Sequence, residues 1–574
     1  MKIPLTEGGK NMLDLIARNE AIVIMWLKSY LNFGSERPTW AYFADSIIAE
    51  HILNYGVEVD ESARMNAFLQ SWKTSVTKLP ADLKSMMKTA TKYGLQMEGL
   101  AFSREIIGSM PIWLHKHADP KLRRLCNSPQ GHCMRGKHRI STVHETEILA
   151  RKLRSVHHKR RKNCACSLCK RTRESVRCEN PHKCYEYAER ILSFLPEKWN
   201  PLKLQPADIE LESLSQGEEG ETQQFDDRIT TRGTLADAFR IFTEGELTNS
   251  LPPLVKNDDN NSEWGVVYCA GASINKNDEN AQTAAATWHG DEHAALNEQL
   301  KIPASLSKSI HGSQVIAIKA AAEGANEIEP ITIRSQSRFA IDALTKNMTD
   351  DEDRGYIDVN HGNVIKATVA RLRERKARSF LTLVQNKDRT VDDERASVKA
   401  EEAIYRTDDD EIDLDIPLQY RITGVKLKTI TQKLATKAIK INNQRIIRKK
   451  KSSLLNRRNT VCNLDRARYA AQSITGRIPT NEAIWKGIKC KDFAIKTRYF
   501  MWMTMHDAYK VGEYWEGKEN MEHRGTCSKC GVTENMEHIL FECEATGQNE
   551  VWSIAQRLWN ERHNAPEWKE PTLG

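Results

Sequence analysis

The amino-acid sequence predicts a multidomain α and α/β protein, in which a central mixed β-sheet with flanking helices lies between helical N- and C-terminal regions that carry small zinc sites. Its 574 residues are too many for one hydrophobic core and predict about three or four domains. Strand and helix patterns alternate in residues 261–405, as in an α/β domain. Eight of the thirteen cysteines lie in two short segments, 164–184 and 527–543. This grouping favours thiolate metal sites over disulfides.

Composition and charge narrow the class of protein. Apolar residues make up 40% and charged residues 28% of the chain, as is usual for a globular protein. The net charge of +8 is modest, but the cations are clustered, and clusters indicate a polyanionic partner. No apolar run reaches the roughly 18 residues of a membrane span, and the first nine residues lack the apolar segment of a signal peptide. We therefore expect a nuclear or cytoplasmic, intracellular protein without a membrane partner.

Residues 1–202 are expected to be mainly helical. In residues 13–27 the apolar side chains recur every three or four positions, which indicates a helix with one buried face. Similar runs at 42–53 and 65–76 predict further packed helices.

A dense run of cations follows in residues 151–162 and ends in Arg160, Arg161 and Lys162. Cations packed this closely repel one another unless they face solvent or a polyanion. We interpret the run as a nucleic-acid contact; a solvated helix face and a nuclear-import signal are the alternatives.

The cation run leads into a predicted zinc site within residues 164–184. Zinc binds four sulfur or nitrogen ligands in a tetrahedron, and a Cys-x2-Cys turn supplies two of them. The candidate ligands are Cys166, Cys169, Cys178, His182 and Cys184. The spacing leaves open whether His182 or Cys184 completes the set, and it leaves Cys164 out. Unpaired buried cysteines are the alternative.

Residues 203–260 are expected to be an acidic linker and the lead-in to the next domain. Glutamate and aspartate dominate its first half, and large apolar side chains are few. Such a stretch buries too little surface to offset its ordering entropy.

Residues 261–405 are expected to form the central α/β domain. Strand patterns come first, at 264–271, 283–289 and 293–301. The elements that follow are a helix at 311–323, a strand at 330–335, helices at 337–346 and 361–375, a strand at 379–385 and a helix from about 392. This order predicts a mixed sheet.

Residues 406–520 are expected to form a basic helical region. Its densest cations are Arg448, Lys449, Lys450 and Lys451, which as phosphate contacts would make binding strongly salt-dependent; a nuclear-import signal or a solvated helix would have the same composition. Aromatic residues at helical spacing in 477–517 favour a hydrophobic core over base stacking.

Residues 521–574 are expected to hold a zinc knuckle and a C-terminal helix. The spacing Cys-x2-Cys-x7-His-x4-Cys supplies a complete set of four ligands, Cys527, Cys530, His538 and Cys543. We therefore predict a structural Zn²⁺ site here.

Six segments within residues 264–400 carry a resemblance to a known family. They are Tyr268-Cys269-Ala270-Gly271-Ala272, residues 312–317, residues 334–345, Glu352-Asp353-Arg354-Gly355-Tyr356, Val384-Gln385-Asn386-Lys387 and Asp393-Glu394-Arg395-Ala396-Ser397. In order and local sequence they are similar to the type 1 ribonuclease H domain carried by fungal, mushroom-type non-LTR retrotransposons. The resemblance implies a ribonuclease H-like mixed sheet with flanking helices.

The resemblance also implies a function. The residues at the family's active-site positions, however, differ from those that the activity requires. The family cleaves the RNA strand of an RNA–DNA hybrid with two Mg²⁺ ions held by four carboxylates. Here the four positions are occupied by Ala270, Gln314, Gln336 and Ser397, and Lys387 stands at the position of the family's histidine. None of the four side chains carries negative charge. We therefore expect a pseudoenzyme that binds nucleic acid, with Mg²⁺ binding and ribonuclease activity weak or lost.

Two alternatives remain open. An active ribonuclease would need displaced metal ligands, for which Asp342, Asp392 and Asp393 are the candidates. A non-catalytic binding or scaffolding protein would make all its contacts through zinc modules and basic helices.

The two ends of the chain resemble parts of non-LTR reverse transcriptases. The zinc pattern with Trp485 and Glu513-Tyr514-Trp515 is similar to their C-terminal zinc knuckle, and Gly8-Gly9 with Pro38-Thr39-Trp40-Ala41 is similar to the region that follows their palm. No Tyr-x-Asp-Asp polymerase signature occurs in the sequence. The expected partners are an RNA–DNA hybrid, RNA or DNA, and a reverse transcriptase acting in trans is a further candidate.

Overall fold

A computed structural model describes residues 8–10, 12–53, 60–210, 222–253, 265–276, 278–449, 458–562 and 567–569. The chain separates into two compact units. The larger unit comprises Leu15–Ile274 and Gln282–Lys440, and the smaller unit comprises Met1–Asp14, Asn275–Ala281 and Ile441–Gly574.

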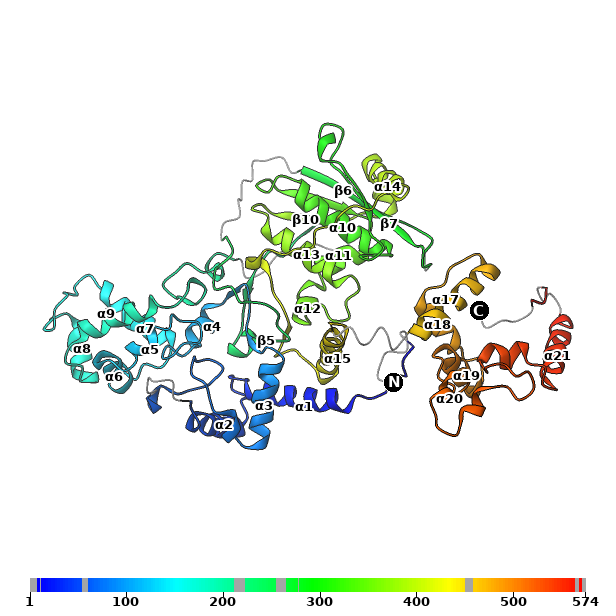
Figure 1. Cartoon of the computed structure of the whole chain (residues 1–574). Helices are drawn as coiled ribbons and strands as arrows, with labels where there is room; N and C mark the ends of the chain where they lie inside the picture. The colour runs from blue at the N-terminus through cyan, green and yellow to red at the C-terminus, as the bar shows by residue number, and fades with distance from the viewer. Residues whose placement is uncertain are drawn as a thin grey trace. The chain divides into compact units, whose positions relative to one another are not determined.

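The first part of the larger unit is largely helical, as predicted (blue to cyan in Figure 1). Its helices are α1 (Leu15–Tyr30), α2 (Thr39–Glu50), α3 (Ala81–Lys92), α4 (Arg104–Ser109), α5 (Leu122–Leu125), α6 (Pro129–Gly136), α7 (Val143–Arg151), α8 (Ser167–Val176) and α9 (Pro181–Leu192). In α1 the predicted apolar face is buried through Ala17, Ala21, Ile24 and Leu27. The core of this part also contains Trp72, Trp113 and Trp199.

The prediction of a helix at 65–76 is wrong. These residues form turns and two isolated bridges, because the Gln70 side chain accepts from the backbone N–H groups of Met65 and Asn66 and holds a non-helical turn.

The stretch 203–260 is more structured than its acidic composition predicts. Of its residues, 211–221 and 254–260 lie outside the described part of the chain. The strands β3 (Gln223–Gln224), β4 (Thr230–Thr231) and β5 (Phe239–Ile241) all pair with other segments. The fully buried β5 lies between β1 (Gln96–Met97) and β11 (Val425–Lys426), and β4 pairs with β2 (Ala101–Phe102). The pairing partners supply the apolar environment that the stretch itself lacks.

A six-stranded mixed sheet organises the second part of the larger unit. Its other strands are β6 (Gly265–Ile274), β7 (Gln282–Trp288), β8 (Glu298–Ile302), β9 (Ile331–Ser335) and β10 (Ser379–Leu383). The order is β3-β10-β9-β6-β7-β8. The β6–β7, β7–β8 and β10–β3 pairs are antiparallel, whereas β9 is parallel to both β6 and β10. The strand expected at 293–301 begins later, at Glu298, because a short 3-10 turn occupies Ala294–Leu296.

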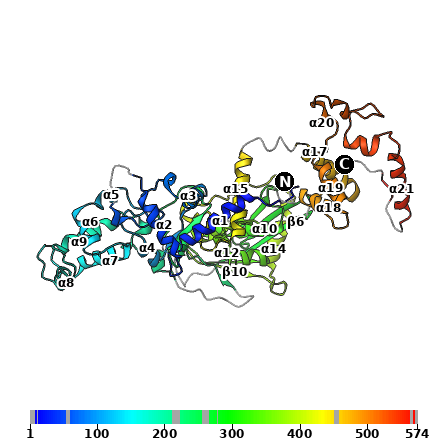
Figure 2. The ribbon, with the colours of Figure 1, turned by 90° about the horizontal axis from the view of Figure 1, so that it is seen from below.

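Helices cover both faces of this sheet (Figures 1 and 2). They are α10 (Ile310–Gly324), α11 (Arg338–Leu344), α13 (Gly362–Glu374) and α14 (Val391–Ile404). The short helix α12 (Met348–Asp353) follows α11 and contacts α11 and β11. Because side chains alternate along a strand, Val267 and Cys269 of β6 pack with α10, α11 and α13. Ala270 and Ala272 belong instead to an alanine-rich layer with α14.

The smaller unit is built around a compact aromatic cluster. Its helices are α17 (Arg458–Thr475), α18 (Asn481–Ile488), α19 (Ile495–Met505), α20 (Glu513–Glu516) and α21 (Gln548–Asn560), and α15 (Gln432–Lys449) crosses from the larger unit. Trp485 is 1% exposed and packs with Trp502, which fits the predicted core role. Tyr499 and Tyr514 are instead 50% and 43% exposed.

Among the described residues, none of the helices combines the length and the low polarity that crossing a membrane requires.

Candidate metal centres and nucleic-acid interface

The four predicted C-terminal ligands converge at one point. One ligand atom from each of Cys527, Cys530, His538 and Cys543 lies within 4.8 Å of the others. The Sγ atoms of Cys527 and Cys530 lie 3.8 and 3.9 Å from Sγ of Cys543. A tetrahedral ion with Zn–S bonds of about 2.3 Å separates its sulfur ligands by about 3.8 Å. The spacing therefore suits zinc, and it is far longer than a disulfide bond of about 2.05 Å.

The local backbone geometry positions these four ligands. The Gly531 N–H donates to the Cys527 carbonyl at 2.9 Å, and Gly531 has φ +71°, so the chain turns tightly after Cys530. The backbone N–H of Cys530 is the main cause that lowers the pKa of Cys527 to about 6, which favours the thiolate that binds metal. A π-helical turn, η12 (His538–Glu542), presents His538. Its Nε2 is buried and has no hydrogen-bond partner in the part of the chain that the structure describes.

The predicted N-terminal ligands do not form one site. Cys166 and Cys169 lie together with His158 and Cys164, whereas Cys178 and Cys184 lie together with Cys133 and His138. The expected grouping of Cys166 and Cys169 with Cys178 is therefore corrected. The reason is α8, whose ten residues rise about 1.5 Å each and hold Cys169 and Cys178 near opposite ends.

Two other residues differ from the sequence expectation in this region. Cys164, which the spacing left out, belongs to the group around His158. His182 belongs to neither group, but its Nδ1 lies 3.1 Å from Nε2 of His158. Sequence reasoning also missed Cys133 and His138, whose Cys-x4-His spacing was the available signal. It placed His158 within the basic run and not in a metal site.

The predicted basic contact residues lie in a loop between two members of the His158 group. Lys159, Arg160, Arg161 and Lys162 are all exposed between His158 and Cys164. In the second predicted patch, Lys450 and Lys451 lie outside the described residues, and Arg448 and Lys449 are described only as backbone of α15.

The substituted positions of the central domain lie around the middle of β6. Cys269 pairs with Ser335, so the next residues in the two parallel strands, Ala270 and Gln336, are neighbours. Gln314 of α10 packs against Gly271 of β6. A Cβ added to Gly271 would lie only 2.8 Å from Cγ of Gln314. Ser397 follows Ala396, which packs in the same alanine layer as Ala270. Lys387 is exposed in a 3-10 turn, η9 (Asn386–Asp388).

The carboxylates that could act as displaced ligands already have cationic or hydrogen-bonding partners. Asp393 pairs with Arg334 at 2.9 Å. Asp392 accepts from Trp288 Nε1 at 3.0 Å and lies 3.3 Å from Arg395. Asp342 lies 3.8 Å from Lys346. Among the described residues, the three groups of possible metal ligands are those already named, and all of their members are cysteine and histidine.

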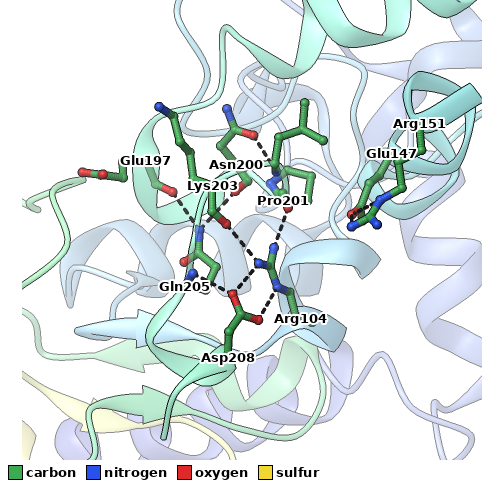
Figure 3. A network of polar contacts seen from close by, with 10 residues as sticks. Arg104, Glu147, Arg151, Glu197, Asn200, Pro201, Lys203, Gln205 and Asp208 are labelled. Carbon is green, nitrogen blue, oxygen red and sulfur yellow. Dashed lines mark hydrogen bonds and ion pairs between the residues drawn. The ribbon is translucent and has the colours of Figure 1, made fainter. Parts of the chain in front are cut away.

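A polar cavity of about 480 Å³ lies beside α4 and the segment after α9. Figure 3 shows the network at its wall, in which Arg104 donates to both oxygens of Asp208 at 2.9 and 2.6 Å and to the Pro201 carbonyl at 2.6 Å. Arg151 is paired with Glu147 and Arg154 with Glu189. All three arginines that line this cavity are thus paired with carboxylates.

Comparison with known proteins identifies part of this architecture. Residues 467–552 match a family model described as zinc-binding in reverse transcriptase. Crystal structures of prototype foamy virus protease–reverse transcriptase, in a CSH mutant and a native form, are similar at 15% and 16% identity with TM-scores of 0.21. In both comparisons 28% of this chain and 24% of the viral chain are covered, so the match spans about a quarter of the viral protein. A comparison with curated proteins gave no match.

The chain therefore carries a zinc-binding domain related to those of reverse transcriptases of retroelements. Together with the cysteine and histidine groups, this domain supports structural zinc and is compatible with a function that involves nucleic acid.

Proposed function

We propose that this chain is a retroelement-derived protein that binds nucleic acid through a zinc-stabilised C-terminal domain, exposed basic segments and a central ribonuclease H-like domain that no longer cleaves. The observation that carries the loss of cleavage is the absence of carboxylates at Ala270, Gln314, Gln336 and Ser397.

The topology of the central sheet supports the ribonuclease H assignment. Three antiparallel strands, β6 to β8, are followed by β9 and β10, which add in parallel on the other side of β6. A helix separates β8 from β9, further helices separate β9 from β10, and α14 follows. This order of elements corresponds to that of the family that the sequence resembles.

Electrostatics supports the loss of metal binding. Two Mg²⁺ ions need several carboxylate oxygens close together, but the four positions offer a methyl group, two amides and a hydroxyl. Arg334 lies directly before Ser335 and Gln336 and is held by Asp393. This ion pair engages the Asp393 carboxylate and leaves it less available to a metal ion.

For the C-terminal domain we propose that Cys527, Cys530, His538 and Cys543 hold one structural Zn²⁺. The sulfur spacing, the buried unpaired nitrogen of His538 and the matched zinc-binding family support this assignment. The ion would stabilise a segment whose own hydrophobic contacts are few.

The first experiment tests hydrolysis. The purified full-length chain is incubated with an RNA–DNA hybrid and Mg²⁺ or Mn²⁺, and cleavage is expected to stay at the background of a protein-free control. A variant with Ala270→Asp, Gln314→Glu, Gln336→Asp and Ser397→Asp is expected to gain metal-dependent cleavage. Cleavage by the natural chain that disappears in Asp342→Asn, Asp392→Asn or Asp393→Asn would instead establish displaced ligands.

The second experiment tests nucleic-acid binding. Affinity for RNA–DNA hybrid, duplex DNA and single-stranded RNA is measured by fluorescence anisotropy over a range of salt concentrations. The triple variant Arg160→Ala, Arg161→Ala, Lys162→Ala is expected to weaken binding and to reduce the salt slope by roughly two to three, about one for each cation–phosphate pair that the variant removes. Exposed lysines outside the run, Lys78, Lys88 and Lys121, are changed to alanine as the matched control. Binding without a salt slope would contradict the proposal and favour a scaffolding protein.

A further inference from the structure

Eight cysteines and histidines of the N-terminal region form two separate groups of four. The outer group is Cys133, His138, Cys178 and Cys184, and the inner group is His158, Cys164, Cys166 and Cys169. All four members of the inner group lie, in sequence, between His138 and Cys178, so one group is nested inside the other.

The inner group has the spacing of a tetrahedral metal site. Nδ1 of His158 lies 3.7, 3.7 and 3.3 Å from Sγ of Cys164, Cys166 and Cys169. With Zn–S bonds of about 2.3 Å and Zn–N bonds of about 2.05 Å, tetrahedral geometry places sulfur and nitrogen about 3.6 Å apart. A metal ion bound by all four atoms would account for this arrangement of one nitrogen and three sulfur atoms.

The other ring nitrogen of His158, Nε2, has a hydrogen-bonding partner. This atom lies 3.1 Å from Nδ1 of His182, and Nε2 of His182 lies 3.8 Å from Glu186. Metal-bound histidines usually use their other ring nitrogen in such a hydrogen bond, which fixes the tautomer and the orientation of the ring. His182 is therefore a positioning residue for His158.

The outer group also has interatomic distances that suit a tetrahedral zinc site. Sγ of Cys178 lies 3.8 Å from Sγ of Cys133 and 3.6 Å from Sγ of Cys184, close to the sulfur spacing of about 3.8 Å around zinc. Nε2 of His138 is buried without a hydrogen-bond partner among the described residues.

We propose that residues 133–184 bind two zinc ions in nested sites, the inner one held by His158 and three cysteines and the outer one by His138 and three cysteines. The inner site closes a local segment of the chain. The outer site ties α6 to the start of α9 across the inner one, which closes a longer loop. The inner ion also fixes both ends of the exposed loop with Arg160, Arg161 and Lys162.

The zinc content of the purified 574-residue chain tests this proposal. We expect about three equivalents per chain by elemental analysis, two from residues 133–184 and one from the C-terminal domain. Cys133→Ser and Cys164→Ser should each lose one equivalent, and the double variant should lose two. Cys126→Ser, a buried cysteine outside both groups, is the matched control and should keep three. A total of two equivalents with no loss in Cys133→Ser would overturn the outer site, and no loss in Cys164→Ser would overturn the inner one.

Two further variants keep the test valid if a serine variant fails to fold. His138→Cys keeps four ligands, so its zinc content should stay at three while the Co²⁺-substituted protein gains thiolate-to-metal absorption. An unchanged spectrum would exclude His138 as a ligand. His182→Phe should retain three equivalents but release one of them about 10–100-fold more readily to a competing chelator. Unchanged release would exclude the positioning role.

Discussion

Gly355 shows how one residue of a recognisable motif is tied to the fold. It has φ +62°, and a Cβ added there would meet the carbonyl oxygen of Gly424 at 2.5 Å. Gly424 is itself at φ +67° against the Ile241 carbonyl. Two backbones thus approach more closely than any side chain permits. The segment Glu352 to Tyr356 carries this glycine because it passes β5 and β11.

Gly355→Ala is therefore expected to lower the free energy of unfolding of the larger unit by about 2–4 kcal/mol, through a left-handed alanine and a backbone clash. Urea unfolding followed by circular dichroism measures this. The control is Gly290→Ala. Gly290 has φ +97°, and a Cβ added there would meet no other atom within 4 Å, so this variant should lower the free energy of unfolding by only about 1 kcal/mol. Equal effects of the two variants would show that the close approach to Gly424 is unimportant.

At the scale of elements, the acidic end of α12 joins three parts of the larger unit. Glu352 binds Arg373 of α13 through two contacts of 2.7 and 3.1 Å. Asp353 lies 3.7 Å from Arg240 of β5 and 3.2 Å from Lys426 of β11. The Glu-Asp pair thereby connects the central domain to the small sheet that the N-terminal region shares.

Glu352→Gln is expected to destabilise the larger unit by about 3–5 kcal/mol, because it leaves Arg373 buried without its opposite charge. The Arg373 side chain is only 5% exposed. The matched control is Glu402→Gln. Glu402 pairs with Lys399 on the surface, so its loss should lower the free energy of unfolding by less than about 1 kcal/mol. Chemical unfolding of both variants provides the comparison, and a loss as small as that of Glu402→Gln would contradict this role.

The start of α14 carries a pH-dependent contact. Burial alone would raise the pKa of Asp393, but hydrogen bonds from Arg334 and Thr390 outweigh it and lower the pKa below its ordinary value of 3.8. Since the folded state holds the charged form more tightly, the stabilisation is complete above the unfolded pKa and is lost as the pH falls through the folded pKa.

Asp393→Asn should therefore be about 1–3 kcal/mol less stable than the natural protein at pH 7. The difference should shrink once the pH falls below about 4. Unfolding at a series of pH values between about 7 and about 2.5 measures it. Asp342→Asn, whose carboxylate lies 3.8 Å from Lys346, serves as the control and should change stability by less than about 1 kcal/mol. A difference for Asp393→Asn that is constant with pH would exclude the charged contact.

At the scale of the whole molecule, the proposed zinc sites divide the chain into parts that would depend on metal and a part that would not. The central sheet has an apolar core between its strands and α10, α11 and α13, and none of the three ligand groups found among the described residues lies in it. The regions around residues 133–184 and 527–543 carry the proposed zinc ligands and would rely on the bound metal.

Chelation of the full-length protein should consequently act on some segments and spare others. After treatment with a strong zinc chelator, residues 133–184 and 527–543 are expected to become sensitive to protease, while residues 265–404 stay protected. Limited proteolysis with mass spectrometry measures this, with re-addition of Zn²⁺ as the control for reversibility. Digestion of 265–404 at the same rate would contradict an independent central core.

Much of the fold could be predicted because its determinants are local in sequence. The apolar strand β6, the amphipathic face of α1 and the elements α10, β9, α11, α13, β10 and α14 follow from periodicity and turn residues. The short helix α12 was not predicted. The C-terminal ligands Cys527 to Cys543 were predictable for the same reason, since they lie within one short segment. The pairing of β5 with β1 and β11 was not, because a three-residue strand has too little pattern of its own.

The sequence by itself determined which side chains are available: the cysteines and histidines, the basic runs, and the uncharged residues Ala270, Gln314, Gln336 and Ser397. Only the tertiary structure decided how the N-terminal cysteines and histidines are grouped. The physical reason is distance, because spacing along the chain does not measure separation in space when a rigid helix intervenes. The helix α8 holds Cys169 and Cys178 apart, and the fold then brings His158 to the first and Cys133 and His138 to the second.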